Sequence, residues 1–312
     1  MAFREPIHFL GAGSIGMCFA AWTRSKIPTY PLNLLVRDHH LQRVKDGCLF
    51  ISFQQLANHQ TTELIKLPVQ SITDDDPIQN LIITTKAYQA KQAVESVLGR
   101  MNESSRIIVL CNGALSVRDD LSKLLQGHDI PLILATTTHG VYKRKDKYEV
   151  VHAGIGNTFV EESADDIGAL WNSVGLYCQS VSSEDMQTVL WKKLAANCVI
   201  NPLTALLQCT NGELLMEPSF PQLQHEIIQE IVQVSSNQDD IDEESLTKFV
   251  YQVIRDTSDN KSSMYQDTLH KQETEIDHLN GYIVRKGREF DIDCSTNEDL
   301  CLRIKQLTKA KI

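Results

Sequence analysis

The stretch that decides the fold is Ile7-His8-Phe9-Leu10-Gly11-Ala12-Gly13-Ser14-Ile15-Gly16. An apolar run leads into a glycine turn, and the turn opens residues 17–22, which read as a helix. In this pattern Gly11 permits the sharp turn, Gly13 lets the backbone approach a pyrophosphate, and Gly16 lets the helix pack closely on its strand. The unpaired N–H groups at the helix N-terminus would bind the anion. The alternative is a turn that binds nothing, because glycines are common at strand ends.

Length and composition are those of an ordinary globular protein. The chain has 312 residues, enough for about two domains, with 42% hydrophobic and 22% charged residues. The net charge of -10 argues against general binding to nucleic acid or to an anionic membrane. We read the basic cluster Lys143-Arg144-Lys145 and the acidic turn at 237–244 as solvated surface features. We therefore expect neither nucleic acid nor a membrane as a partner.

The eight cysteines indicate a reducing compartment and no metal site. They include no C-x-x-C pair and no His partner at zinc spacing. Several lie inside apolar runs, where a free thiol packs as a small hydrophobic group. The N-terminus has no apolar signal core, and no apolar run is long enough to span a bilayer. We expect a cytoplasmic protein with no membrane partner.

A second apolar run, residues 32–36, predicts a buried strand that ends at Arg37. In this nucleotide-binding plan, the residue after the second strand faces the adenosine ribose. An acidic side chain there would bond the 2′-hydroxyl, whereas an Arg would accept a 2′-phosphate. We interpret Arg37 as the phosphate clamp and Asp38 as the cap of the next helix, which predicts NADP(H) as the cofactor. The alternative is a surface Arg that follows a strand.

Three further apolar runs each end in polar residues. Residues 80–85 run into Lys86, 106–111 into Asn112, and 132–138 into His139, and the stretches 87–98 and 115–125 between them read as helices. This alternation predicts βα units and a parallel sheet, whose ligands bind at the carboxyl ends of the strands. Lys86, Asn112 and His139 are expected at that edge. For His139 the alternative is a ring that satisfies a local backbone group.

After residue 139 the alternation of strands and helices ends. Residues 148–160 predict an antiparallel addition to the sheet, 164–174 one more helix, and 178–183 the close of the first domain; the remainder reads as almost wholly helical. The sequence therefore predicts an α/β, doubly wound domain over residues 1–183 and a helical domain over 184–312.

A polar stripe marks the helix predicted around Trp191-Lys192-Lys193-Leu194-Ala195-Ala196-Asn197-Cys198-Val199-Ile200-Asn201-Pro202. Lys193, Asn197 and Asn201 are four residues apart, so they share one face of an otherwise apolar helix. Burying these groups is costly unless partners are supplied, and a polar ligand would supply them. The alternative is a solvent-facing stripe, although Asn is a poor helix former. Pro202 either kinks this helix or begins a new one capped by Asn201.

The last informative stretch runs from Ser262 to Gly281. Ser262 or Ser263 is a candidate N-cap of a helix. Asp267, Lys271 and Glu275 follow at intervals of four, which predicts that they share one helical face.

Taken together, these motifs resemble the ketopantoate reductase family. The resemblance rests on GAGSIG, TTKAYQ around Lys86, CNG at Asn112, TTTHG at His139, WKKLAANCVINPLTA, NGEL, SSMYQD and TEIDHLNGY, and it runs from the first strand nearly to the C-terminus. It implies a Rossmann-type N-terminal domain followed by an all-α C-terminal domain. It also implies NADPH-dependent reduction of 2-dehydropantoate to (R)-pantoate, a step in pantothenate and coenzyme A biosynthesis.

The resemblance also implies roles for single residues. Lys193 would be the general acid, and Glu275 would orient the substrate and tune the lysine. The residues implied in cofactor binding are Gly11, Ala12, Gly13, Ser14, Ile15, Gly16, Arg37, Lys86 and Asn112. The residues implied in substrate binding are Asn112, Lys193, Asn197, Asn201, Asn211 and Ser263. Hydride addition to a ketone builds alkoxide charge, which a positioned ammonium stabilises and then neutralises.

One departure from the family pattern leaves the substrate open. After Thr158 this chain continues Phe159-Val160-Glu161, where relatives commonly have an Ile-Gly pair. Alternatives are an NADPH-dependent reductase of another branched 2-keto acid, a dehydrogenase of a 3-hydroxy acid, and a non-catalytic NADP-binding regulatory protein. The retained Lys193 and Glu275 argue against a regulatory protein, because binding alone needs no acid. The expected assembly is a monomer or a homodimer.

Overall fold

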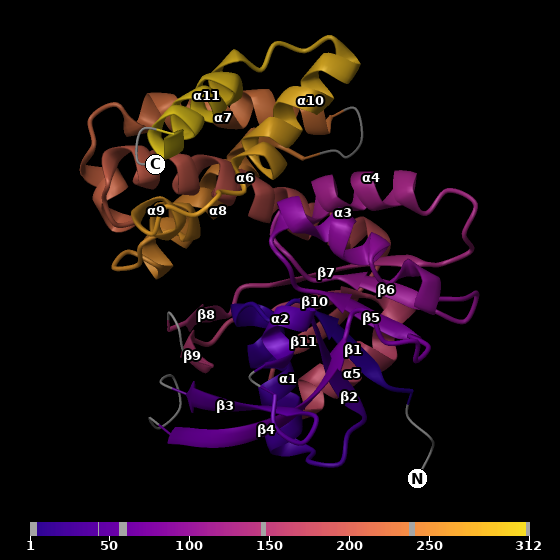
Figure 1. Cartoon of the computed structure of the whole chain (residues 1–312). Helices are drawn as coiled ribbons and strands as arrows, with labels where there is room; N and C mark the ends of the chain where they lie inside the picture. The colour runs from indigo at the N-terminus through magenta and orange to yellow at the C-terminus, as the bar shows by residue number, and fades with distance from the viewer. Residues whose placement is uncertain (1–4, 43, 56–60, 145–147, 237–240, 310–312) are drawn as a thin grey trace. The chain divides into compact units, whose positions relative to one another are not determined.

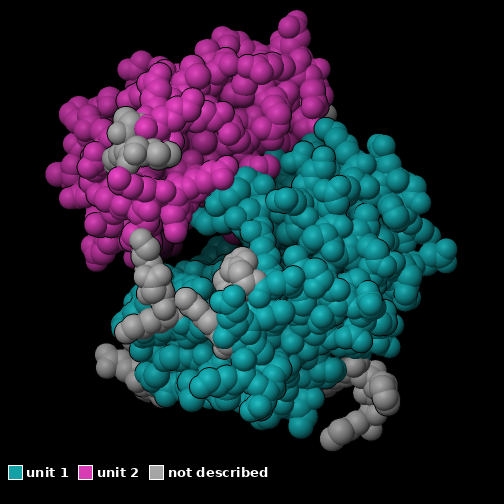
Figure 2. Space-filling view, viewed as in Figure 1, with its two compact units in different colours: residues 1–186 teal, residues 187–312 magenta. Residues whose placement is uncertain are grey.

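The computed structural model describes residues 5–42, 44–55, 61–144, 148–236 and 241–309. The chain divides into two compact units, Met1–Met186 and Gln187–Ile312 (Figure 2). The basic cluster and the acidic turn expected from the sequence include residues 145 and 237–240, which lie outside the described residues. Each unit is described separately below.

The first unit is built on one mixed sheet (Figure 1). Its described strands are β1 Ile7–Leu10, β2 Leu32–Val36, β3 Cys48–Gln55, β4 Thr61–Ser71, β5 Asn80–Ile83, β6 Arg106–Val109, β7 Leu132–Thr137, β8 Gly140–Lys143, β9 Glu149–Gly154, β10 Thr158–Glu161 and β11 Cys178–Val181. They lie in the order β11-β10-β7-β6-β5-β1-β2-β4-β3-β9-β8. The strands expected at β1, β2, β5, β6 and β7 are all present.

The central strands β4, β2, β1, β5, β6 and β7 are parallel throughout. Numbered among themselves in chain order, they run 3-2-1-4-5-6, which is the order of a doubly wound dinucleotide-binding domain. The order reverses between β1 and β5, and ligands of such sheets bind at the carboxyl ends of the strands beside that point. The predicted α/β, Rossmann-type fold is confirmed.

Helices cover both faces of this sheet (Figure 1). Helices α1 (Ser14–Lys26) and α5 (Asp165–Ser173) share one core with the sheet, in which the rings of Phe19 and Trp171 lie 5.1 Å apart, edge to face. Helices α3 (Ala87–Glu95) and α4 (Ala114–Leu124) pack together outside that core. The connections include α2 (Asp38–Leu41) and the short 3-10 helices η1 (Leu98–Arg100) and η2 (Glu162–Ala164).

Strands β3, β4 and β8 were not expected from the sequence. β3 pairs antiparallel with β4 and parallel with β9. Its alternate residues Leu49, Ile51 and Phe53 are buried in the same core as α1. The antiparallel addition expected at 148–160 is confirmed, because β9 pairs antiparallel with β8, and β10 with β7.

His139 lies inside this core and not at the ligand edge. Its Nε2 lies 3.1 Å from the Leu176 carbonyl, and its Nδ1 accepts from the Gly156 N–H and faces His152 Nε2 at 2.9 Å. These partners assign a neutral ring that satisfies local groups, so the expectation of an edge position was wrong and its alternative holds. The physical reason is that His139 turns toward Phe19 of α1.

Burial disfavours protonation of this histidine pair. Burial lowers the pKa of His139, and burial together with the repulsion from a protonated His139 lowers the pKa of His152 to about 4. The Nδ1 atom of His152 has no hydrogen-bond partner among the described residues, so a proton added there would be buried without an acceptor.

The second unit is helical, as expected. Its described helices are α6 Ser183–Leu207, which begins in the first unit, α7 Phe220–Ser235, α8 Glu243–Asp256, α9 Ser263–Leu269, α10 Asn280–Phe290 and α11 Ser295–Lys309, with the 3-10 helices η3 Gly212–Met216 and η4 Ile276–His278. None of the helices in the described ranges is long and apolar enough to cross a membrane. Among the same residues, no three His, Cys, Asp or Glu side chains gather as metal ligands.

We predict that acid destabilises the first unit partly through His152. The unfolded chain takes up a proton at His152 below pH 6.5, whereas the folded chain resists it until about pH 4, so stability falls as the pH falls through this window. Between pH 7 and pH 4.5, the free energy of unfolding should fall by about 1–3 kcal/mol less in His152→Gln than in the wild type. Urea unfolding followed by tryptophan fluorescence measures this.

The matched control is His128→Gln, which changes an exposed histidine of the same unit and should keep the wild-type pH dependence. An identical loss of stability on acidification in His152→Gln and in the wild type would contradict the prediction.

Candidate functional site

Two glycines of the motif that follows β1, Gly11 in the loop and Gly16 in α1, are required by close packing. Gly11 has φ +118, and a Cβ there would lie 2.9 Å from the backbone nitrogen of Thr85. A Cβ at Gly16 would lie 2.2 Å from Thr84 Oγ1 and 2.4 Å from the Gly11 carbonyl oxygen. Neither approach leaves room for a side chain. The loop and the start of α1 therefore lie against the end of β5, at the point where the strand order reverses.

Thr84 ties the ends of β1 and β5 together. Its backbone N–H donates to the Leu10 carbonyl at 2.9 Å, and its hydroxyl lies 3.0 Å from the Gly11 carbonyl. Sequence reasoning missed this residue, because a Thr at the end of a strand carries no distinctive signal. Its contacts fix the glycine loop at the carboxyl edge of the sheet.

Gly13 differs from its two neighbours in the motif. It has φ -82, which any residue adopts, and a Cβ there would meet only the Thr84 carbonyl oxygen at an ordinary 3.5 Å. The folded chain alone therefore does not require a glycine at this position. A ligand that approaches the backbone here would require one.

Three helices begin at this edge without a side-chain cap. Gly13, Lys86 and Gly113 are the N-cap residues of α1, α3 and α4, and none of the three helices has an acidic residue in its first turn. These helices follow the adjacent parallel strands β1, β5 and β6. The N-terminus of a helix carries partial positive charge, so this edge is suited to an anion.

The expected cofactor residues lie along this edge. Lys86 and Asn112, both partly buried, follow β5 and β6, as the sequence predicts. Arg37 is exposed and directly follows β2. Asp38 is the first residue of α2 and not the residue before it, and its Oδ1 accepts from Ser71 Oγ at 2.5 Å. The Asp38 carboxylate thus bonds to the last residue of β4, so the prediction that Asp38 is the N-cap of α2 was wrong.

In the second unit, the polar stripe lies on one continuous helix. Lys193 and Asn197 are partly buried, and Asn201 is only 5% exposed. A solvent-facing stripe is therefore excluded at Asn201. Pro202 lies inside α6, so the alternative of a new helix capped by Asn201 is also excluded.

Pro202 leaves one backbone acceptor of α6 without its usual donor. The amide of residue 202 would bond the carbonyl of Cys198, four residues earlier, but proline has no N–H. The side-chain amide of Asn280 donates to that carbonyl at 2.9 Å. Asn280 is the first residue of α10 and is fully buried. A side chain from another helix therefore replaces the hydrogen bond that Pro202 removes from α6.

Glu275 lies on a tight turn and not on a long helix. It is 4% exposed and is the N-cap residue of η4. Helix α9 ends at Leu269, and Lys271 adopts φ +55, so the prediction that Asp267, Lys271 and Glu275 share a helical face was wrong. The cause is the backbone bond from the Gln272 N–H to the Asp267 carbonyl, which turns the chain out of the helix.

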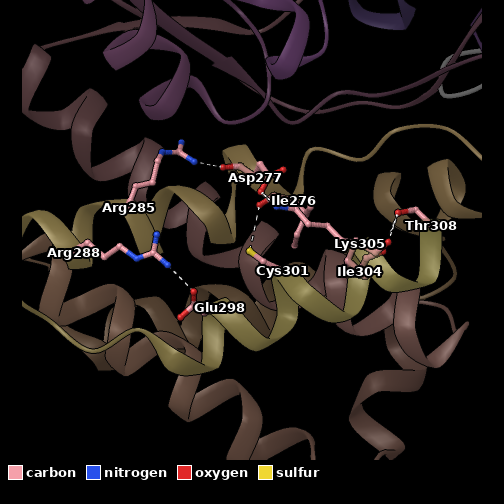
Figure 3. A network of polar contacts seen from close by, with 9 residues as sticks. All are labelled: Ile276, Asp277, Arg285, Arg288, Glu298, Cys301, Ile304, Lys305 and Thr308. Atoms are coloured by element: carbon pink, nitrogen blue, oxygen red, sulfur yellow. Dashed lines mark hydrogen bonds and ion pairs between the residues drawn. The ribbon is translucent and has the colours of Figure 1, made fainter. Parts of the chain in front are cut away.

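The turn that follows Glu275 is held from two helices (Figure 3). Arg285 of α10 donates to the Asp277 carbonyl at 2.7 Å, and Lys305 of α11 lies 2.5 Å from Asp277 Oδ1. The thiol of Cys301 lies 3.9 Å from the Ile276 carbonyl oxygen. The position of η4, and with it that of Glu275, is thereby fixed within the second unit.

The remaining substrate-binding candidates have different surroundings. Ser262 is the N-cap of α9, where its hydroxyl accepts from the Tyr265 N–H at 3.1 Å, and Ser263 is exposed. Asn211 is 6% exposed, and its side-chain amide donates to Thr257 Oγ1 at 2.9 Å. The amide oxygen of Asn211 has no partner among the described residues.

Comparison with known proteins covers both units. Residues 7–165 match the model described as "Ketopantoate reductase PanE/ApbA", and residues 185–308 match "Ketopantoate reductase PanE/ApbA C terminal". A 2-dehydropantoate 2-reductase of Vibrio cholerae is 35% identical over 243 residues, which are 74% of this chain and 78% of that protein.

Two solved structures share the fold at low sequence identity. A PanE/ApbA family ketopantoate reductase from Ralstonia eutropha JMP134 superposes with a TM-score of 0.85 at 20% identity, covering 98% of this chain and 99% of that one. D-mandelate dehydrogenase, solved with NADH and anilino(oxo)acetate, gives the same TM-score, identity and coverage. With both of its units matched by the family models, the chain belongs to the ketopantoate reductase family.

Proposed function

We propose that this protein is an NADPH-dependent 2-dehydropantoate 2-reductase, which reduces a small 2-keto acid to the 2-hydroxy acid (R)-pantoate. The observation that carries the proposal is the stripe of Lys193, Asn197 and Asn201 on α6, an ammonium and two amides on one face of a largely buried helix. Family membership and the names of its relatives support the same reaction. In this proposal the first unit binds the cofactor and the second supplies the acid.

The glycine loop fits the pyrophosphate of a dinucleotide. Gly13 has no packing reason to lack a side chain, and the positively polarised N-termini of α1, α3 and α4 lie at adjacent strand ends. Lys86 and Asn112 follow two of these strands and would complete the cofactor site. These features support the set implied by the family resemblance, from Gly11 to Gly16 together with Arg37.

The surroundings of Arg37 support the phosphorylated cofactor. An NAD-binding domain of this type uses an acidic side chain after the second strand to bond the ribose 2′-hydroxyl. Here that position holds an exposed Arg37, and the neighbouring Asp38 carboxylate is already bonded to Ser71. Arg37 is thus the charged side chain that would receive a 2′-phosphate.

The residues of the second unit fit the chemistry of ketone reduction. When bound, NADPH supplies a hydride to the ketone carbon. Lys193 would donate a proton to the ketone oxygen, on which alkoxide charge develops. Glu275 would orient the substrate and tune the lysine, while Asn112, Asn197, Asn201, Asn211 and Ser263 would hold its carboxylate and hydroxyl groups.

A second candidate is a reductase of another branched 2-keto acid. D-mandelate dehydrogenase shares this fold, so the scaffold alone does not specify 2-dehydropantoate. Steady-state rates of NADPH oxidation with a panel of 2-keto acids separate the two candidates. The proposed function requires 2-dehydropantoate to give the largest kcat/KM.

We predict that Lys193→Ala lowers kcat by about 10²–10⁴-fold, because the general acid is lost. The Kd for NADPH should change little, since the cofactor residues belong to the first unit. The matched control is Lys192→Ala, which removes the adjacent and similarly buried ammonium from outside the stripe. Equal turnover in the wild type and Lys193→Ala would refute the acid role.

We predict that Arg37→Ala weakens NADPH binding by about 10- to 100-fold, the loss expected for charge-assisted hydrogen bonds. Binding of NADH, which lacks the 2′-phosphate, should change less than threefold. Fluorescence titration of both cofactors with both proteins gives the four constants. Parallel losses for NADH and NADPH would remove the phosphate-clamp interpretation.

We predict that Gly13→Ala folds normally but binds NADPH at least tenfold more weakly. The added methyl meets only ordinary contacts in the protein, yet it occupies the approach of the pyrophosphate. Gly99→Ala is the control, since a Cβ there meets nothing within 4 Å. Both variants should unfold thermally near the wild-type temperature, and undiminished NADPH affinity in Gly13→Ala would argue against pyrophosphate binding at the glycine loop.

A further inference from the structure

The carbonyl of Cys198 is the acceptor that α6 cannot satisfy from its own backbone. Pro202 removes the donor, and the proline ring also crowds the carbonyl four residues before it. A buried carbonyl without a donor is unfavourable, so its partner has to come from elsewhere in the chain. That partner is the side-chain amide of Asn280, at 2.9 Å.

Asn280 acts here as a donor only. Its amide nitrogen bonds both the Cys198 carbonyl and Asn297 Oδ1, each at 2.9 Å. Its own amide oxygen, by contrast, has no donor among the described residues, although the side chain is fully buried. Both N–H groups are thus used while the acceptor is left unsatisfied, which points to donation as the role of this side chain.

The second bond of Asn280 anchors it to two more helices. Asn297 of α11 donates its side-chain amide to Glu230 Oε2 at 2.6 Å. The same carboxylate of α7 accepts the backbone N–H groups of Thr296 and Asn297, and so caps the first turn of α11. Asn280 is therefore held in a buried network that joins α6, α7, α10 and α11.

This network lies beside the residues that the proposed function uses. Cys198 directly follows Asn197 and precedes Asn201 by three positions on α6. Asn280 follows Glu275 by five positions, across the turn η4. One side chain thus fixes the helical turn that carries two substrate-binding candidates.

We propose that Asn280 is a positioning residue, which replaces the amide missing at Pro202 and holds the turn of α6 that presents Asn197 and Asn201 to a branched 2-keto acid. This inference rests on the proposed function for its substrate. Asn280 acts through the Cys198 carbonyl and touches neither cofactor nor substrate in this account. It differs from the residues of the active site in being replaceable by a backbone N–H.

The test restores the missing N–H by mutation. Asn280→Ala should raise KM for 2-dehydropantoate by about 10- to 100-fold, the effect of a misplaced substrate-binding group, while KM for NADPH stays unchanged. In the double variant Pro202→Ala/Asn280→Ala, residue 202 regains its N–H and can bond Cys198. The KM of the double variant for the keto acid should then lie within about threefold of the KM of Pro202→Ala, a difference of less than about 1 kcal/mol in binding.

Asn297→Ala is the matched control. It breaks the other bond of the same amide but leaves the bond to the Cys198 carbonyl in place, so it should lower stability and raise KM for the keto acid less than Asn280→Ala does. Hydrogen–deuterium exchange of peptides covering residues 194–207 gives a readout independent of activity. Exchange there should accelerate in Asn280→Ala and slow again in the double variant.

The outcomes separate this inference from the proposed function. If the wild type does not reduce 2-dehydropantoate, the proposed function fails, and the exchange data still decide whether Asn280 replaces the amide of Pro202. If KM for both substrates rises equally, or if Pro202→Ala restores neither KM nor protection, the positioning role is overturned. If Asn280→Ala does not fold, the double variant has to fold, and its failure to do so would also overturn the role.

Discussion

The close approach of α1 to the ends of β1 and β5 is the constraint on which the first unit depends. At Gly16 there is no room for a single methyl group beside Thr84 and the Gly11 carbonyl. This approach places the N-terminus of α1 directly at the point where the strand order reverses. The same geometry leaves room for a side chain at Gly13, so a packing requirement and the proposed binding role share one short segment.

In the second unit, helix α6 carries both a polar stripe and a proline. A helix that buries amides and lacks a backbone donor needs partners from outside. Asn280 supplies one of them, and the contacts of Arg285 and Lys305 with Asp277 fix the neighbouring turn. The residues that would perform the chemistry are thus supported by side chains that would take no part in it.

Much of the fold could be predicted from the sequence, because buried parallel strands read as continuous apolar runs. The runs at β1, β2, β5, β6 and β7 were each identified, as was the stripe on α6. Strands β3 and β4 were missed. Their sequences alternate only partly between apolar and polar residues, and what makes them strands is packing against α1, a contact distant in sequence.

In the candidate site, too, features set by neighbouring residues could be predicted, whereas those set by contacts distant in the sequence could not. Lys86 and Asn112 could be placed at the ligand edge, because strand ends are a local feature. His139 follows a strand in the same way, yet it turns into the core toward His152, which the local sequence does not reveal. The presence of Pro202 in a helix predicts that the Cys198 carbonyl lacks its backbone donor. The donor that replaces it, Asn280, lies 82 positions away, and nothing in the residue spacing identifies it.

We propose that the chain reduces 2-dehydropantoate with NADPH. The most direct measurement is the initial rate of cofactor oxidation by the purified protein with 2-dehydropantoate, compared between NADPH and NADH. We predict turnover to pantoate, with kcat/KM for NADPH at least about tenfold above that for NADH. Absence of turnover with either cofactor, in a protein that is folded by circular dichroism, would contradict it.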